Sequence, residues 1–225
     1  MVDPKYQEMK QVWEERSEEM GNTARAVLFK RFPGFVNSWI HRQHVSFILS
    51  QLPPETSNLL DVGCGYGRLS RIVQEHRPTI SFEGVDLCQK FAQEYERNIG
   101  PCFCGPVQAF KPEKTFDAIL VVTLLMYLGI EEQKDLIDRL MQFLRPSGRL
   151  ICIEPALEFQ TAFRKIFRRK SLSPTGGNVH YFHARELEDL LTRSHNISVI
   201  GHCRISALPW TSRIPVHHCI AITRT

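Results

Sequence analysis

Short apolar runs alternate along the chain with longer segments whose apolar residues recur at helical spacing. The run 59–62, for example, is followed closely by Leu69, Ile72 and Val73, which share one face of a helix. Because strands that alternate with helices form a parallel sheet, the pattern predicts an α/β fold. The segments that predict strands are 59–62, 80–86, 101–105, 116–123, 149–154, 196–205 and 216–223.

The chain before and after the alternating region has a different organisation. Residues 6–32 and 36–52 predict amphipathic helices, with a break near Gly21 and turns at Pro33 and Pro53. Residues 184–194 predict a further helix. We therefore divide a single domain of residues 1–225 into a helical cap (1–54), a core (55–155), a second cap (156–183) and a C-terminal helix with two strands (184–225).

Composition narrows the class of protein. The chain has 225 residues, 43% of them hydrophobic, which suits one core better than two. A net charge of +4 is too small to indicate a nucleic-acid partner by itself. Seven cysteines without a C-x-x-C pair predict reduced thiols and a cytoplasmic protein. Nine histidines show no metal-ligand spacing, and no apolar stretch is long enough to cross a membrane.

Candidate chemistry is concentrated after the first strand. Asp61 is followed by glycines at positions 63, 65 and 67, and glycine adopts positive φ at little cost, so a ligand can approach the backbone of a tight turn. The amides that open the next helix then face that ligand. Asp86 ends the second strand, where an acid accepts hydrogen bonds from ribose hydroxyls. Arg68 and Ser70 stand where a dinucleotide fingerprint requires glycine, which argues against a nicotinamide site.

The segment from Asp61 to Gly67 resembles motif I of the class I S-adenosylmethionine-dependent methyltransferases, and the resemblance continues through Asp86 to Glu154. It implies a Rossmann-like, doubly wound, seven-stranded sheet with an antiparallel last strand, and S-adenosylmethionine as the cofactor. Gln108 stands where relatives carry an acid for the adenine amino group, and its carbonyl can accept the same hydrogen bond. The residues expected to bind the cofactor are Asp61, Gly63, Cys64, Gly65, Gly67, Arg68, Asp86, Leu87, Val107, Gln108, Val122, Thr123 and Arg42.

Two arginines compete for the carboxylate of that cofactor. The sequence 65–70 is similar to the loop of the protein N-terminal methyltransferases, in which the arginine pairs with this carboxylate. Arg68 also begins a helix, where a cation is unfavourable unless an anion lies beside it. Arg42 lies at a distance before the loop from which other relatives supply such an arginine. We predict that Arg68 makes the main contact.

Methyl transfer is an in-line displacement, so the protein has mainly to align the reactants in a dry pocket. A base is needed only for an acceptor that must lose a proton. Both His180 and His183 have a structural alternative as helix caps, and Glu154 has one as a solvated strand end. The candidate bases are His180, His183, Glu154 and His41.

Aromatic and basic side chains are the candidate substrate contacts. The second cap interleaves phenylalanines at helical spacing with basic residues, which suits an anionic substrate, a phosphate or a membrane surface. A solvated basic face is the structural alternative, and core packing is the alternative for the aromatic residues. The residues expected to contact substrate are Tyr127, Tyr181, Trp13, Trp39, Arg168 and Arg169.

We therefore expect methyl transfer to an O, N or C atom of a small molecule, by a monomer or homodimer with at most weak membrane-surface contact. A peptide N-terminus is the alternative that the Arg68 loop suggests. A nucleic-acid methyltransferase is disfavoured because the N-P-P-[YFW] signature is absent after the fourth strand. A non-catalytic cofactor-binding subunit is disfavoured by the intact Asp61, glycines and Asp86.

Overall fold

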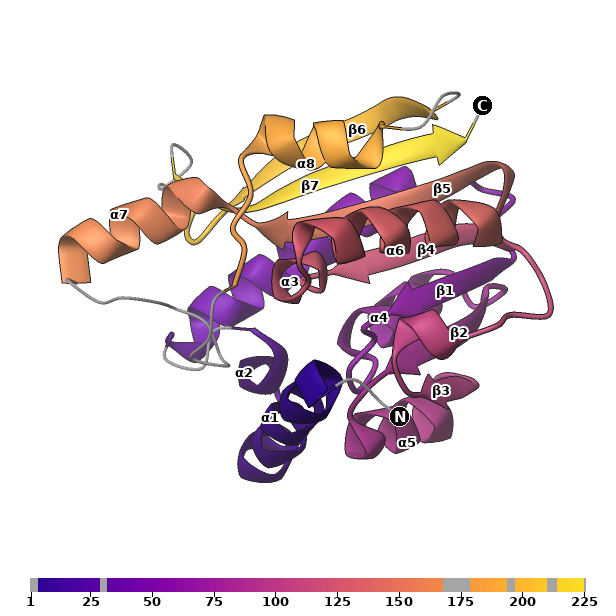
Figure 1. Cartoon of the computed structure of the whole chain (residues 1–225), viewed down its shortest axis with the longest axis horizontal. Helices are drawn as coiled ribbons and strands as arrows, with labels where there is room; N and C mark the ends of the chain where they lie inside the picture. Colours follow the sequence, from indigo (N-terminus) through magenta and orange to yellow (C-terminus); the bar gives the residue numbers. More distant parts are fainter. Residues whose placement is uncertain (1–3, 29–31, 168–178, 194–196, 210–213, 225) are drawn as a thin grey trace.

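The computed structural model describes residues 4–28, 32–167, 179–193, 197–209 and 214–224. One seven-stranded sheet lies at its centre, with the order β3-β2-β1-β4-β5-β7-β6 (Figure 1). The pairings from β3 to β5 are parallel, whereas β7 pairs antiparallel with β5 and β6, which confirms the predicted sheet. The strands are β1 (Asn58–Val62), β2 (Ser81–Asp86), β3 (Cys102–Cys104), β4 (Phe116–Val122), β5 (Leu144–Pro155), β6 (Ile197–Ser206) and β7 (Pro215–Arg224).

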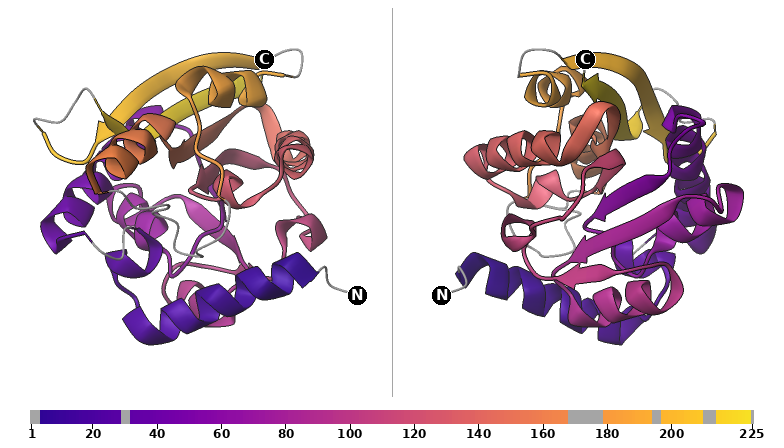
Figure 2. Two further views of the ribbon diagram at one scale, coloured as in Figure 1. Left: turned by 60° about the vertical axis from the view of Figure 1, so that its left-hand side comes forward. Right: turned by 90° about the vertical axis from the view of Figure 1, so that its right-hand side faces the viewer.

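Helices cover both faces of the sheet. Ile48 of α3, Val73 of α4 and Tyr95 of α5 belong to the core on one face, and Leu136 of α6 and Leu187 of α8 to the core on the other. The helix α1 lies beside α5 at the β3 side of the sheet (Figure 2). The helices are α1 (Pro4–Met20), α2 (Ala24–Val27), α3 (Gly34–Gln51), α4 (Arg68–His76), α5 (Gln89–Asn98), α6 (Ile130–Phe143), α7 (Leu157–Phe167) and α8 (Ala184–Leu191), with 3-10 turns η1 (Val107–Ala109) and η2 (Leu125–Tyr127).

The register of the central strands brings three loops together. All residues of β4 are buried, as expected for a continuous apolar run covered on both faces. Val62 at the end of β1 is paired with Val85 of β2 on one side and with Val121 of β4 on the other. The residues that follow these strands therefore meet at one edge of the sheet, where α/β proteins bind ligands.

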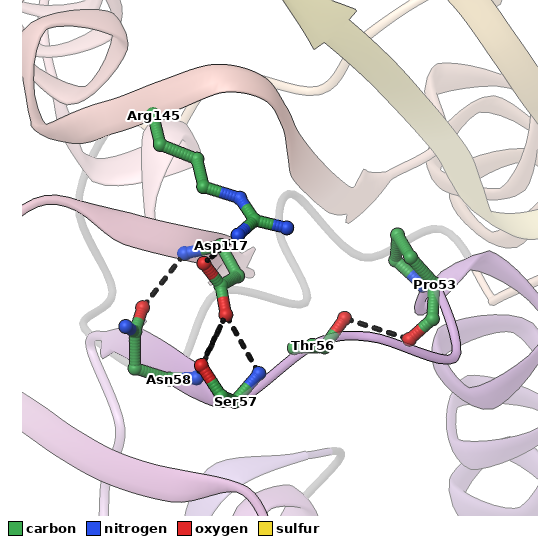
Figure 3. Close-up of polar contacts among 6 residues, drawn as sticks. All are labelled: Pro53, Thr56, Ser57, Asn58, Asp117 and Arg145. Atoms are coloured by element: carbon green, nitrogen blue, oxygen red, sulfur yellow. Dashed lines mark hydrogen bonds and ion pairs between the residues drawn. The ribbon is translucent and has the colours of Figure 1, made fainter.

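Asp117 fixes the opposite end of the same strands. Its Oδ2 accepts hydrogen bonds from the Ser57 amide at 2.6 Å, the Ser57 hydroxyl at 2.8 Å and the Asn58 amide at 3.1 Å (Figure 3). The Arg145 guanidinium lies 2.9 Å from the other oxygen. Burial alone would raise the pKa of Asp117, but these hydrogen bonds and the Arg145 charge lower it. This arginine–carboxylate pair ties β1, β4 and β5 together.

Some element boundaries differ from the prediction. The fifth strand was expected over residues 149–154, but β5 begins at Leu144, which pairs with Phe116. The register then shifts before the pairing resumes at Ala118, and Ser147 has a φ of 61° inside the strand range. The C-terminal helix ends at Leu191 instead of 194. Among the described residues, no helix is both long and apolar enough to cross a membrane.

Candidate functional site

The glycine loop between β1 and α4 needs its glycines. Gly63, Gly65 and Gly67 have φ values of 73°, 55° and 83°. Residues with a Cβ adopt this left-handed backbone region only at a cost in conformational energy. A Cβ on Gly67 would also lie 2.8 Å from a side-chain carbon of Ile99. The loop is tied to β2 because the amides of Gly63 and Cys64 both donate to the Val85 carbonyl, at 2.8 and 3.2 Å. The predicted turn is therefore held in one conformation.

Asp86 lies at the end of β2 and faces this loop. Its Oδ2 accepts a hydrogen bond from the Gly65 amide at 2.7 Å, and its Oδ1 accepts one from the Cys88 amide at 2.8 Å. Burial raises the pKa of Asp86 to about 6, although these amide hydrogen bonds oppose the rise. Each oxygen keeps a lone pair for a further donor, so the carboxylate can accept hydrogen bonds from a ligand.

Asp61 has a more internal position. Its carboxylate accepts a hydrogen bond from the Ser70 hydroxyl at 2.5 Å, and the Tyr95 hydroxyl donates to Ser70 at 3.2 Å. Burial raises the pKa of Asp61 to about 6. The side chain thus links the end of β1 to the first turn of α4, and it also lines the hollow that contains Arg68.

Three adjoining hollows surround the glycine loop, and Gly63 lines all three. The first, of about 530 Å³, has mostly apolar walls and includes Asp86. The second, of about 370 Å³, includes Val107 and Gln108 of η1 together with Asp86. The third, of about 350 Å³, includes Asp61, Arg68 and Thr123. Predicted cofactor residues that line them are Asp61, Gly63, Cys64, Gly65, Arg68, Asp86, Leu87, Val107, Gln108, Val122 and Thr123.

The three adjoining hollows form one groove around the glycine loop, and the N-terminal helix α1 forms one of its walls. Met9 lines the first and second hollows, Tyr6 the second and Trp13 the first. The Trp13 ring packs edge-on against Tyr127, with 5.8 Å between ring centroids, and the Arg16 guanidinium lies 5.3 Å from the Trp13 centroid. The predicted substrate residues Trp13 and Tyr127 therefore lie together at the groove.

The two competing arginines have different surroundings. Arg68 is buried, with 9% of its surface exposed, and burial lowers its pKa to about 10. Its guanidinium donates to the ring nitrogens of His41 at 2.7 Å and His44 at 3.4 Å. Arg42 is exposed and lies 5.8 Å from the centroid of the Trp39 ring. Arg42 and Trp39 therefore contact each other and line none of the three hollows.

Glu154 is fully buried instead of being a solvated strand end. Its Oε1 accepts hydrogen bonds from the amides of Leu124 and Leu125, at 2.9 and 2.8 Å, and its Oε2 accepts one from Met126 at 3.3 Å. Burial raises the pKa of Glu154 to about 8, against the effect of these hydrogen bonds. The carboxylate thus holds η2 after β4 and does not line the hollows.

The two histidines before α8 contact acidic residues. His180 Nε2 lies 2.7 Å from Glu186 Oε1, and the His180 amide donates to the Met126 carbonyl at 2.8 Å. This places residue 180 beside η2, next to Tyr127. His183 precedes α8, its side chain is 62% exposed, and its Nδ1 lies 3.8 Å from Glu158. Tyr181, between them, packs against the core that contains α6 and α8.

Several predictions on the second cap cannot be followed in the structure. Arg168 and Arg169 lie outside the described residues, which resume at 179.

His41, the remaining candidate base, accepts a hydrogen bond from Arg68. Burial together with neighbouring arginines lowers the pKa of His41 to about 4. Within the described parts of the chain, no cluster of histidine, cysteine or acidic side chains could hold a metal ion.

The sequence did not identify every residue that the fold brings to the site. Tyr6, Met9 and Leu124 line the hollows, but each is an ordinary apolar or aromatic residue of a helix or turn. His44 is paired with His217 of β7, 173 positions away in the chain. Only the i, i+3 spacing of His41 and His44 carries a local signal, because it places both on one helix face.

Two curated proteins resemble part of the chain. A malonyl-[acyl-carrier protein] O-methyltransferase of Ilyobacter polytropus is 24% identical over 102 residues, which make up 43% of this chain and 39% of that protein. Nodulation protein S of Rhizobium tropici is 28% identical over 117 residues, or 49% of this chain and 48% of that protein. The match spans less than half the length of either relative.

A solved structure shares the whole fold. Magnesium protoporphyrin IX methyltransferase from Synechocystis PCC 6803, crystallised with bound SAM, has a TM-score of 0.69 with this chain. The two are 14% identical, and the alignment covers 100% of this chain and 99% of that one. Residues 35–196 match the family described as a methyltransferase domain. That match covers most of the chain, including the glycine loop and the second strand with Asp86 at its end. The chain therefore belongs to the methyltransferase domain family.

Proposed function

We propose that the chain transfers a methyl group from S-adenosylmethionine to a small molecule. The observation that carries the proposal is that a carboxylate and a buried cation lie along one groove around Gly63. Asp86 lines two of its hollows and Arg68 the third. A nucleoside joined to an amino acid needs this pair, because its ribose hydroxyls require an acceptor and its carboxylate requires a cation.

The groove residues suit the three parts of that cofactor. Val107 and Gln108 would flank the adenine ring, with the Gln108 carbonyl accepting from the amino group. Asp86 would accept from the ribose hydroxyls. Arg68 would bind the carboxylate, because the hydrogen bonds of this buried guanidinium go to the ring nitrogens of His41 and His44, and the nearby Asp61 carboxylate acts on it through its charge. A buried charge is costly unless it is paired, so an anionic ligand at Arg68 lowers that cost.

The chemistry itself requires little from the protein. S-adenosylmethionine would supply a methyl group bound to a sulfonium sulfur, and the neutral thioether S-adenosylhomocysteine would be the leaving group. Met9, Trp13 and Tyr127 line the largest hollow, so these apolar side chains would exclude water and orient the acceptor. The same wall favours a small acceptor, since α1 covers this side of the groove. An acceptor other than nucleic acid, and a monomeric or homodimeric state, remain predictions.

His180 is our proposed base for an acceptor that must lose a proton. Its backbone is anchored beside η2, and its ring is held by Glu186 at 2.7 Å. A carboxylate that accepts a hydrogen bond from an imidazole in this way orients the ring and fixes its tautomer. His183, which is more exposed, is the second candidate. Glu154 is engaged by three backbone amides, which favours a structural role for its carboxylate.

Calorimetry tests the proposal first. S-adenosylmethionine and S-adenosylhomocysteine should bind, and NAD should not. Binding of neither sulfur compound would contradict the proposed function. A second step supplies S-adenosylmethionine with a labelled methyl group together with a small-molecule extract, a peptide pool or RNA. Labelled small molecules are the expected product, whereas labelled peptides alone would favour the N-terminal methyltransferase alternative.

A further inference from the structure

Four side chains from three elements form a polar cluster at the core of the protein. Arg68 begins α4, His41 and His44 lie one helical turn apart on α3, and His217 lies on β7. His44 and His217 are buried, with 0% and 2% of their surfaces exposed. β7 is a strand of the far half of the sheet, next to its β6 edge (Figure 1). The cluster therefore links the glycine loop to the C-terminal part of the fold.

The contacts run from the cation to the strand. Arg68 Nη1 lies 2.7 Å from His41 Nδ1, and Nη2 lies 3.4 Å from His44 Nδ1. His44 Nε2 in turn lies 3.3 Å from His217 Nδ1. The rings of His44 and His217 also meet edge to face, with 4.8 Å between their centroids. Each ring nitrogen of His44 thus has a defined partner.

These contacts fix the tautomers of the histidines. A guanidinium can only donate, so the Nδ1 atoms of His41 and His44 must accept. A neutral His44 then carries its proton on Nε2, and this N–H donates a hydrogen bond to His217 Nδ1. The rings can do this only while they are neutral. Burial, with nearby arginines, lowers the pKa of His41 to about 4, and burial lowers that of His217 to about 3, so both are neutral near pH 7.

The hydrogen-bond partners of Arg68 are neutral, and the nearby Asp61 carboxylate acts on the guanidinium through its charge. The contrast is Arg145, whose guanidinium lies 2.9 Å from the Asp117 carboxylate at the other end of the sheet (Figure 3). There a carboxylate cancels the charge and the pair serves the fold. At Arg68 the hydrogen-bond partners are imidazole nitrogens, and Arg68 lines the hollow together with Gly63 and Thr123. Imidazoles can orient a guanidinium without neutralising it.

We infer that His44 and His217 are positioning residues that hold the Arg68 guanidinium toward the cofactor carboxylate. This inference rests on the proposed function, in which that carboxylate binds Arg68. Without the hydrogen bond to His217, the His44 ring is no longer held in the orientation in which its Nδ1 accepts from Arg68, and the bound carboxylate loses a preorganised partner. The effect is specific for a ligand that has the carboxylate, because the adenosine end of the groove is formed by other residues.

The test compares S-adenosylmethionine with its decarboxylated form, by calorimetry on the full chain. His217→Leu removes the acceptor for His44, whereas His217→Asn keeps an oxygen near the position of Nδ1. We expect His217→Leu to weaken binding of S-adenosylmethionine about tenfold, which is the effect of losing one hydrogen bond of about 1.4 kcal/mol. Binding of the decarboxylated form should not change. His217→Asn should restore most of the affinity for S-adenosylmethionine.

A double-variant cycle separates positioning from a general structural role. In Arg68→Met, the further change His217→Leu should not alter the ratio of the two dissociation constants. In the protein that keeps Arg68, the inference would be overturned if His217→Leu left the ratio of the two dissociation constants unchanged, for example by weakening both ligands equally. If His217→Leu does not fold, His217→Asn and His44→Asn carry the same comparison, because only His44→Asn breaks the contact with His217. Failure of the wild type to bind S-adenosylmethionine would instead refute the proposed function.

Discussion

Removal of the Asp86 carboxylate is the most direct test of how the groove binds a nucleoside. In Asp86→Ala the Gly65 and Cys88 amides lose acceptors at 2.7 and 2.8 Å, and a bound ribose loses its charged acceptor. A hydrogen bond to a charged group contributes about 1.5–3 kcal/mol, so losing one raises Kd about ten- to a hundredfold. We expect this loss for S-adenosylmethionine and S-adenosylhomocysteine alike, because both carry the same ribose.

The pH dependence of binding provides a second measurement on the same residue. The free protein has an Asp86 pKa of about 6, raised by burial from a value near 3.8. The ionised carboxylate is the better acceptor for hydroxyls, so affinity should fall as pH drops below about 6 and stay level above it. Asp86→Asn removes this titration. Asp61 also has a pKa of about 6, so the bend in a plot of log Kd against pH should weaken without vanishing.

Calorimetric titrations of the wild type, Asp86→Ala and Asp86→Asn between pH 5 and 8 give both results in one series. Circular dichroism and thermal unfolding of each variant control for damage to the glycine loop. An unchanged Kd in a folded Asp86→Ala variant would refute the proposal that Asp86 accepts hydrogen bonds from the ribose. A wild-type Kd that does not vary across this range would refute the argument from burial.

The remaining predictions concern the cation and the candidate bases. Arg68→Met should raise the Kd of S-adenosylmethionine about ten- to a hundredfold, and Arg42→Met should leave it near the wild-type value; the reverse result in calorimetry would reassign the carboxylate contact. Glu154→Ala should lower the melting temperature, because three backbone amides lose their acceptor and each amide left unsatisfied costs about 1–3 kcal/mol of stability. A folded Glu154→Gln variant with greatly reduced kcat would instead identify Glu154 as the base. His180→Ala should lower kcat by about 10²–10⁴-fold and His183→Ala much less, and the opposite order in steady-state kinetics would transfer the role to His183.

The sequence alone was sufficient for the parallel core and for the glycine turn at its edge. Apolar runs alternating with helical segments predicted the strands, because burial on both faces requires near-continuous apolar residues. The glycines at 63, 65 and 67 predicted the turn, since positive φ is a local property of the backbone. Asp86 followed from the same logic, because the end of a strand is a position along the chain.

Contacts between distant segments required the tertiary structure. The sequence predicted Arg68 over Arg42 for the carboxylate contact, but it could not show that Arg68 is buried and Arg42 exposed, because burial depends on how α3 packs against α4. Glu154 was a candidate base with a solvated strand end as the alternative, and the structure instead buries its carboxylate against the amides of the turn after β4. His217 shows no sequence signal that relates it to α3, and only the position of β7 in the fold brings its ring to His44. Burial, charge and hydrogen-bond partners are properties of packed elements, so the surroundings of these side chains were decided by the fold.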